Sequence, residues 1–167
     1  LLIGTAPHKN LERSIEALKD ISCRIRVLGK LSPAQRRLLD DGGYQYSAEY
    51  GLDNAEMRTE YENADIVLFC SLFEGFGMPI IEAQACGRPV ITSDLPPMRN
   101  VAGDGAVLVN PENVREIRDA VCRMIADPGL RNSLVKKGVE NVVRFRADTI
   151  AERYLEIYRE ITAGIKC

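Results

Sequence analysis

The feature that most constrains the fold is a regular alternation of short apolar runs with stretches of helical periodicity. Strand-like runs occupy residues 1–4, 25–28, 44–47, 66–69, 90–92 and 106–109. Helical stretches lie between them at residues 11–19, 33–40, 54–63, 79–86 and near Pro97. This order is typical of a parallel sheet with helices on both faces. The sequence therefore predicts an α/β fold, a three-layer α/β/α domain with a parallel sheet of about six strands.

The last third of the chain has helical periodicity only. One apolar stripe contains Val114, Ile117, Val121 and Met124, and a second contains Ile150, Tyr154, Ile157 and Ile161. Asp127, Pro128 and Gly129 separate the helices. The length of 167 residues suits one domain with a substantial core, so residues 1–167 are expected to form a single unit.

Composition excludes several classes of partner. The net charge of −2 gives no bulk attraction to nucleic acid or to a membrane surface. Tryptophan is absent, which argues against a stacking platform for single-stranded nucleic acid. No apolar run approaches the roughly 20 residues of a membrane span, so no integral membrane segment is expected in this fragment.

The cysteines indicate a reducing compartment. The chain has five cysteines and one histidine, without a Cys-x-x-Cys pair, so we expect no zinc site and no metal site. The thiols are Cys23, Cys70, Cys86, Cys122 and Cys167. We expect them to be reduced in a cytoplasmic protein. The chain begins directly on a strand-like run, which suggests a fragment of a larger protein.

The turn before the helix at 79–86 predicts an anion site. Gly75 and Gly77 permit positive φ and close approach of the backbone to a ligand. Pro79 suits the first helical position, which makes Met78 the expected N-cap. Methionine has no side-chain acceptor for the free N–H groups of the first helical turn. These donors and the helix dipole favour a phosphate group.

Two glutamates lie on either side of this turn. Glu82 is about one turn into the helix, too deep for a capping box, and a carboxylate repels phosphate. It therefore suits a neutral donor such as a ribose diol, and Glu74 could accept from a transferred sugar in the same way. The alternative is that Glu82 only complements the helix dipole and Glu74 is a solvated loop residue. The combination with the glycines and the proline favours a nucleotide sugar.

This segment resembles the E-x7-E motif of retaining glycosyltransferases with the GT-B fold, specifically the large GT4-type family. The resemblance continues through residues 82–94, is visible at residues 4–10, and covers nearly the whole chain. It implies a Rossmann-like C-terminal, donor-binding domain that forms one half of a GT-B enzyme. The N-terminal acceptor domain of that architecture is absent from this chain.

The resemblance implies a role for each residue of the motif. Glu74 would orient the donor sugar, and Glu82 would hold the ribose. The remaining donor-binding residues of the turn would be Gly75, Phe76, Gly77 and Met78. The backbone N–H groups of the last three would help Glu74 to orient the donor sugar.

The loop after the first strand contributes a basic residue. Asn10 is the expected N-cap of the next helix, and a cation beside it at Lys9 is disfavoured unless an anion lies between. The resemblance implies that Lys9 is catalytic with Glu74, because it stabilises the departing diphosphate; the alternative is a solvated lysine. Gly4 is also expected to bind donor. His8 could contact phosphate or shape the loop.

Two further positions are expected near the nucleobase. Leu52 follows the third strand, where relatives contact the base, and Gly29 closes the second strand. Leu52 could instead be a hydrophobic staple for the helix that begins at Asp53, and Gly29 could be only a turn residue.

The sequence has no Asp-x-Asp pair, the usual carboxylate holder of a metal-bound diphosphate in the other common glycosyltransferase architecture. The resemblance implies metal-independent transfer with retention of configuration, without a cofactor. The donor would be UDP- or GDP-linked, and the group transferred a hexosyl, with mannosyl among the candidates. The acceptor would be a glycan or lipid-linked saccharide, and the full-length protein could lie at the inner face of the membrane.

Three other functions are alternatives for an α/β domain of this kind. A non-catalytic nucleotide-binding module would be indicated by a gene without an upstream Rossmann-like domain. A dehydrogenase would need Gly-x-Gly-x-x-Gly after the first strand, and residues 4–10 lack it. A sugar-nucleotide epimerase half shares the fold, but the spacing of Glu74 and Glu82 favours transfer. The fragment by itself is expected to bind donor weakly and to transfer nothing.

Overall fold

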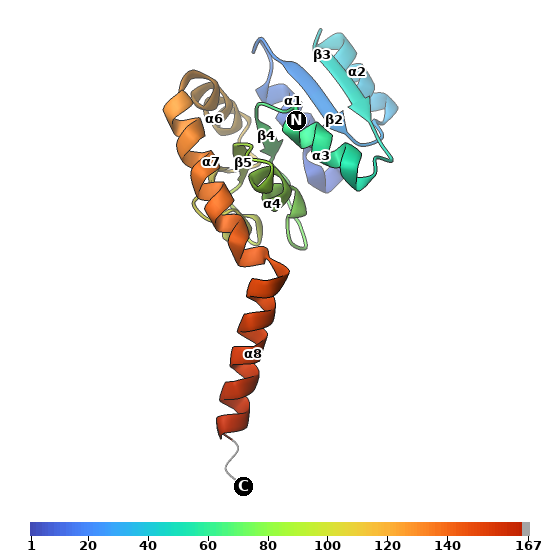
Figure 1. Cartoon of the computed structure of the whole chain (residues 1–167). Helices are drawn as coiled ribbons and strands as arrows, with labels where there is room; N and C mark the ends of the chain where they lie inside the picture. The colour runs from blue at the N-terminus through green and yellow to red at the C-terminus, as the bar shows by residue number, and fades with distance from the viewer. Residues whose placement is uncertain (165–167) are drawn as a thin grey trace.

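The computed structural model describes residues 1–164 and contains one sheet of six parallel strands (Figure 1). The strands are β1 (Leu2–Ile3), β2 (Arg24–Leu28), β3 (Gln45–Glu49), β4 (Val67–Phe69), β5 (Val90–Ser93) and β6 (Ala106–Val109). Their order in the sheet is β3-β2-β1-β4-β5-β6. This order confirms the predicted parallel α/β sheet and is that of doubly wound nucleotide-binding folds.

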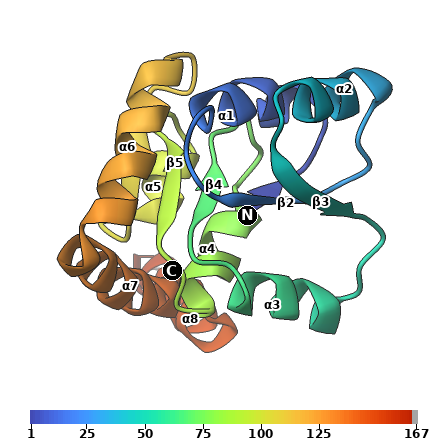
Figure 2. The ribbon, with the colours of Figure 1, turned by 90° about the horizontal axis from the view of Figure 1, so that it is seen from above.

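Helices cover both faces of the sheet. They are η1 (Pro7–Lys9), α1 (Leu11–Ala17), α2 (Pro33–Asp41), α3 (Asn54–Glu62), α4 (Met78–Ala85), α5 (Met98–Ala102), α6 (Val114–Ala126), α7 (Pro128–Val142), η2 (Val143–Phe145) and α8 (Ala147–Gly164). Figure 2 shows α1 and α2 on one side of the sheet, and α3 and α4 on the other. The predicted three layers are therefore present.

The core consists of two clusters, one on each face. The first joins β-strand residues to α1, α2 and α6, and the second joins them to α3, α4 and α5. Along β6, Val107 and Val109 face the first cluster, while Ala106 and Leu108 face the second. This alternation follows from the two-residue period of a strand, and because both faces are covered, the strands read as unbroken apolar runs.

Helices α2 and α3 each begin with a side-chain cap, and the one at Asp53 confirms a predicted helix start. Ser32 accepts from the N–H of Gln35, and Asp53 accepts from the N–H of Glu56. In each case the residue at the third helical position returns a bond to the N–H of the cap, so α2 and α3 both begin with a capping box.

Some predicted boundaries are wrong by one or two residues. The cap of α4 is Gly77, not Met78, so Met78 is the first helical residue and Pro79 the second. Gly77 has φ 106° and ψ 43°, a conformation that methionine adopts at a cost, so the helix begins one residue earlier than proline preference suggested. Glu49 and Ser93 end strands, because ladder pairs with Leu28 and Val109 extend β3 and β5.

The last helix projects away from the sheet (Figure 1). Its apolar side chains are exposed: Ile150, Tyr154, Leu155, Ile157, Tyr158 and Ile161. The predicted stripe therefore exists, but within residues 1–164 it packs against no other layer. In this same range, no helix has the length and apolarity that crossing a membrane requires.

Candidate functional site

The candidate site lies where the chain order of the sheet reverses. Strands β1 and β4 are neighbours, yet β1 leads to α1 on one face and β4 leads towards α4 on the other. The loops after these strands therefore diverge, and this reversal point at the carboxyl ends of the strands, called the crevice below, is where open parallel sheets bind ligands. The predicted residues of the two loops come together at this point.

Lys9 and Glu74 form an ion pair across the crevice. The Lys9 Nζ lies 2.6 Å from Oε1 of Glu74, and only 19% and 12% of the two side chains are exposed. The Nζ also lies 4.9 Å from the centre of the Phe69 ring. The stem of Lys9 crosses Gly4, where φ is +88° and an added Cβ would lie 2.7 Å from Lys9 Cγ. Gly4 is therefore required for the position of Lys9.

Further hydrogen bonds hold the two loops together. The N–H of Leu72 donates to the carbonyl of His8 at 2.8 Å. The buried amide of Asn10 donates to the carbonyl of Cys70 at 3.0 Å and to that of Pro111 at 2.7 Å. His8 contributes its main-chain carbonyl to this connection, and the residue is exposed at the surface.

Asn10 is the N-cap of α1, as predicted, but its side chain does not cap the helix. Its φ of 57° is left-handed, and its side-chain amide donates to carbonyls of other loops instead. The tertiary contacts therefore replace the local role that the sequence suggested.

The turn before α4 presents free backbone donors. None of the loop and cap hydrogen bonds in the described chain starts from the N–H groups of Phe76, Gly77 or Met78, and no side chain caps α4. An added Cβ at Gly75 would meet nothing within 4 Å, so the turn is open on that side. Together with the dipole of α4, these groups form a site that an anion can satisfy.

Glu82 faces a different neighbour. Its Oε2 accepts a hydrogen bond of 2.6 Å from the hydroxyl of Tyr61, on α3. Tyr61 is 2% exposed, and burial together with the bond to Glu82 raises the pKa of the phenol far above its usual range. The hydroxyl therefore stays protonated and donating, and it orients one carboxylate oxygen while Oε1 remains available to another donor.

The remaining predicted residues lie towards the β3 edge of the sheet. Gly29 follows β2, and its N–H donates to the carbonyl of Glu49 at 2.7 Å. Leu52 is half-buried in the loop between β3 and α3. Gly29 lies against the loop after β1, since an added Cβ would be 2.7 Å from Thr5 Cγ2. Leu52 follows β3, which is two strands from β1 and therefore roughly 10 Å away, so Leu52 does not join the Lys9 and Glu74 pair directly.

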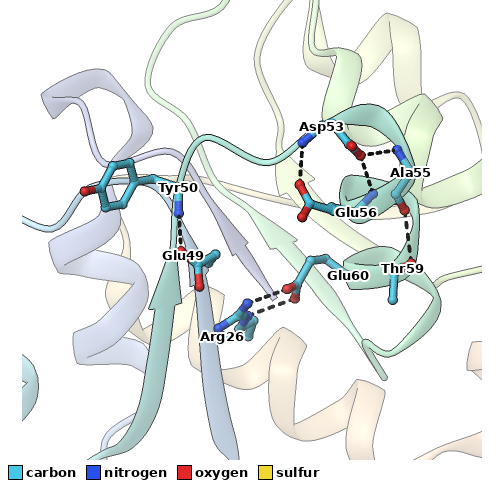
Figure 3. A network of polar contacts seen from close by, with 8 residues as sticks. All are labelled: Arg26, Glu49, Tyr50, Asp53, Ala55, Glu56, Thr59 and Glu60. Atoms are coloured by element: carbon cyan, nitrogen blue, oxygen red, sulfur yellow. Dashed lines mark hydrogen bonds and ion pairs between the residues drawn. The ribbon is translucent and has the colours of Figure 1, made fainter.

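The loop that contains Leu52 leads into a helix that is fixed by polar contacts (Figure 3). Asp53 caps α3, and Arg26 of β2 pairs with Glu60 of α3, with the Arg26 Nε lying 2.8 Å from Glu60 Oε2. The hydrogen bond from Arg26 lowers the pKa of Glu60. The N–H of Tyr50 donates to Oε1 of Glu49, and its ring points away from these contacts.

Tyr61 is the site residue that the sequence interpretation missed. Tyr61 and Met57, four residues apart on α3, both pack in the core cluster on that face of the sheet. No local pattern connects Tyr61 with Glu82, because the bond depends on how α3 and α4 pack.

Residues 1–164 contain no group of three or more histidine, cysteine, aspartate or glutamate side chains arranged to hold a metal ion. The described cysteines, Cys23, Cys70, Cys86 and Cys122, are free thiols. Cys167 lies outside the described residues.

The chain is similar in sequence to glycosyltransferases of other organisms. The O-antigen chain mannosyltransferase B of Escherichia coli is 24% identical over 171 residues, which cover 95% of this chain and 45% of that protein. The O-antigen chain mannosyltransferase RfbU of Salmonella typhimurium is 31% identical, over 91% of this chain and 46% of that protein. The chain thus spans less than half the length of these relatives.

Solved structures give the same result. Sucrose-phosphate synthase from Thermosynechococcus elongatus matches with a TM-score of 0.80 and 26% identity, over 94% of this chain and 43% of that one. The C-terminal domain of the glycosyl transferase group 1 family protein LpcC from Francisella tularensis matches with a TM-score of 0.71 and 25% identity, over 84% and 82%. The fold is that of a GT-B glycosyltransferase domain.

The crevice at the strand reversal, the open helix start and these matches agree with the expected family. Residues 4–141 match the family described as "Glycosyl transferases group 1". This match covers more than half of the chain, and the chain belongs to that family.

Proposed function

We propose that this chain binds a nucleoside diphosphate sugar, linked to UDP or GDP, in the crevice between the loops after β1 and β4. The observation that supports this most is the ion pair of Lys9 with Glu74 beside the free N–H groups of residues 76–78. A diphosphate can accept from these donors and from Lys9, while Glu74 accepts from sugar hydroxyls.

Glu82 and its neighbours would hold the nucleoside. The carboxylate accepts from Tyr61 of α3, the helix that follows the loop of Leu52. A ribose can donate to Oε1, and the base can then reach the loop after β3. The order along the ligand is base, ribose, diphosphate and sugar, from β3 towards β4.

The reaction would be transfer of a hexosyl group with retention of configuration and without a metal. Lys9 and the N–H groups of the turn stabilise the negative charge that develops on the departing diphosphate. Glu74 fixes the sugar. The named relatives include mannosyltransferases, which supports mannose as one donor sugar, and a glycan or lipid-linked saccharide as acceptor.

The acceptor would bind to a separate domain in a longer, cytoplasmic protein. Two observations support this arrangement: the relatives are about twice as long as the matched region, and α8 exposes apolar side chains. We therefore expect the 167-residue chain to bind donor weakly and to transfer no sugar by itself. Transfer by the purified chain to a saccharide acceptor would contradict this.

The proposed function is tested by calorimetric titration with UDP, GDP and ADP, without added metal. We expect one nucleotide to bind, and Glu82→Ala to weaken that binding. Glu62→Ala is the matched control, because Glu62 lies on neighbouring α3 and pairs with Arg58 outside the crevice. Equal affinity of Glu82→Ala and wild type would refute the role of Glu82. Binding of none of the three nucleotides would contradict donor binding by this chain.

A further inference from the structure

An aromatic contact connects the turn before α4 with a distant part of the chain. Phe76 lies between Gly75 and Gly77 and is 41% exposed. Its ring meets the ring of Phe145 edge to face, with centroids 5.7 Å apart and an interplanar angle of 89°. Phe145 is the last residue of η2, the short helix that joins α7 to α8. Edge-to-face pairs of this geometry are favourable beyond the area that they bury.

Phe145 is itself held firmly. It packs against the core cluster formed by α3, α4 and α5. The guanidinium of Arg144 lies 5.1 Å from the centre of the Phe145 ring and donates to Asn141 Oδ1 at 2.8 Å. Asn141 is 9% exposed and donates to Gln84 Oε1 at 2.9 Å, and so fixes the end of α7 against α4. The ring of Phe145 is therefore a fixed support.

The turn has few other restraints. Its start is held by the pair of Glu74 with Lys9, and its end by α4. Between them lie two glycines, and glycine gives the backbone its largest conformational freedom. The N–H groups of residues 76–78 make no bond among the loop and cap hydrogen bonds of the described chain. The contact of Phe76 with Phe145 thus restrains the middle of the turn through a side chain.

We propose that Phe145 is a positioning residue for the turn of residues 74–78. It touches no part of the proposed ligand; by fixing Phe76, it holds the free N–H groups in the direction that a phosphate requires. Loss of this support would leave the donors mobile, and binding would then have to order them first. This inference rests on the proposed function for its effect on affinity, but its effect on the turn does not depend on a ligand.

The test uses Phe145→Leu in the 167-residue chain, because leucine keeps apolar volume and removes the ring. Backbone ¹⁵N relaxation should give order parameters of about 0.85 for residues 75–78 in wild type and below about 0.6 in the variant. The affinity for UDP or GDP should fall roughly threefold to tenfold, the range expected for an aromatic pair. Phe145→Tyr retains the ring edge and should restore both values.

Tyr154→Ala is the matched control. It removes another aromatic pair, Tyr154 with Tyr158 at 6.4 Å, from exposed α8 and should change neither measurement. Equal order parameters in Phe145→Leu and wild type would overturn the proposal. Lower order parameters for residues 75–78 in Phe145→Leu would support the positioning role. If wild type also bound neither UDP nor GDP, the proposed function would be contradicted while the positioning role stood.

Discussion

The two glutamates of the motif are held in different ways, although only seven residues lie between them in the chain. Glu74 is paired with a cation, Lys9, from the loop after β1. Glu82 is paired with a neutral hydroxyl, that of Tyr61, from α3. A carboxylate beside an ammonium group has its charge largely offset, whereas a carboxylate beside a phenol retains its full charge.

This difference indicates what each region can bind. The region of Glu74 offers a cation, helix N–H groups and a carboxylate, and therefore suits the junction between phosphate and sugar. The region of Glu82 offers an oriented negative charge without a cation, so it would repel phosphate and attract hydroxyl donors. The following changes would separate the two regions, in order of decreasing effect.

The largest effect is expected from Lys9→Met, which keeps the stem over Gly4 and removes the charge. A charge-assisted hydrogen bond contributes about 1.5–3 kcal/mol, so affinity for UDP or GDP should fall roughly tenfold to a hundredfold. Titration calorimetry measures this. Lys19→Met, at an exposed lysine beyond α1, is the control. An affinity unchanged by Lys9→Met would exclude contact with the diphosphate.

Glutamine at each motif position should distinguish the two carboxylates. Glu82→Gln should lower the affinity for the nucleoside diphosphate and for the nucleotide sugar equally, by about tenfold. Glu74→Gln should leave the affinity for the nucleoside diphosphate nearly unchanged. It should remove only the additional affinity that the nucleotide sugar has over the nucleoside diphosphate. Paired titrations with UDP and a UDP-hexose, or the GDP equivalents, decide this. The same loss in both variants would show that the carboxylates do not have separate roles.

Tyr61→Phe should have a moderate effect, since it removes one hydroxyl without changing the core. The lost hydrogen bond should lower the free energy of unfolding by about 0.5–1.5 kcal/mol at pH 8. Nucleotide affinity should fall about threefold, because Glu82 loses its orientation. Urea unfolding and calorimetry test the two effects. Tyr154→Phe on α8 is the control, as this phenol is exposed.

The smallest effect is a pH dependence of the Tyr61 contribution. Because the pKa of Tyr61 is raised in the folded chain, the phenol stays protonated there while the unfolded phenol ionises near pH 10. Its contribution is therefore complete below pH 10 and decreases as the pH rises. The loss should be about 0.8 kcal/mol at pH 10.5. The stability difference between wild type and Tyr61→Phe should shrink accordingly, and a constant difference would contradict the buried, donating phenol.

Much of the fold could be predicted because its signals are local. The apolar runs predicted six strands of a parallel sheet, and the helix start at Asp53 was also predicted. The start of α4 was misplaced by one residue, since the left-handed conformation of Gly77 decides the cap and proline preference does not. The pairing of Lys9 with Glu74 was not predicted, because it depends on β1 and β4 being neighbours in the sheet.

The sequence by itself determined the alternation of elements, the open helix start and the two carboxylates, since each depends on residues a few positions apart. Only the tertiary structure decided what each carboxylate touches. The hydroxyl of Tyr61 reaches Glu82 because α3 and α4 share one face of the sheet, and Phe145 reaches Phe76 because α7 returns across α4. Contacts between residues so far apart in the chain leave no periodicity or spacing in the sequence, because packing alone brings them together.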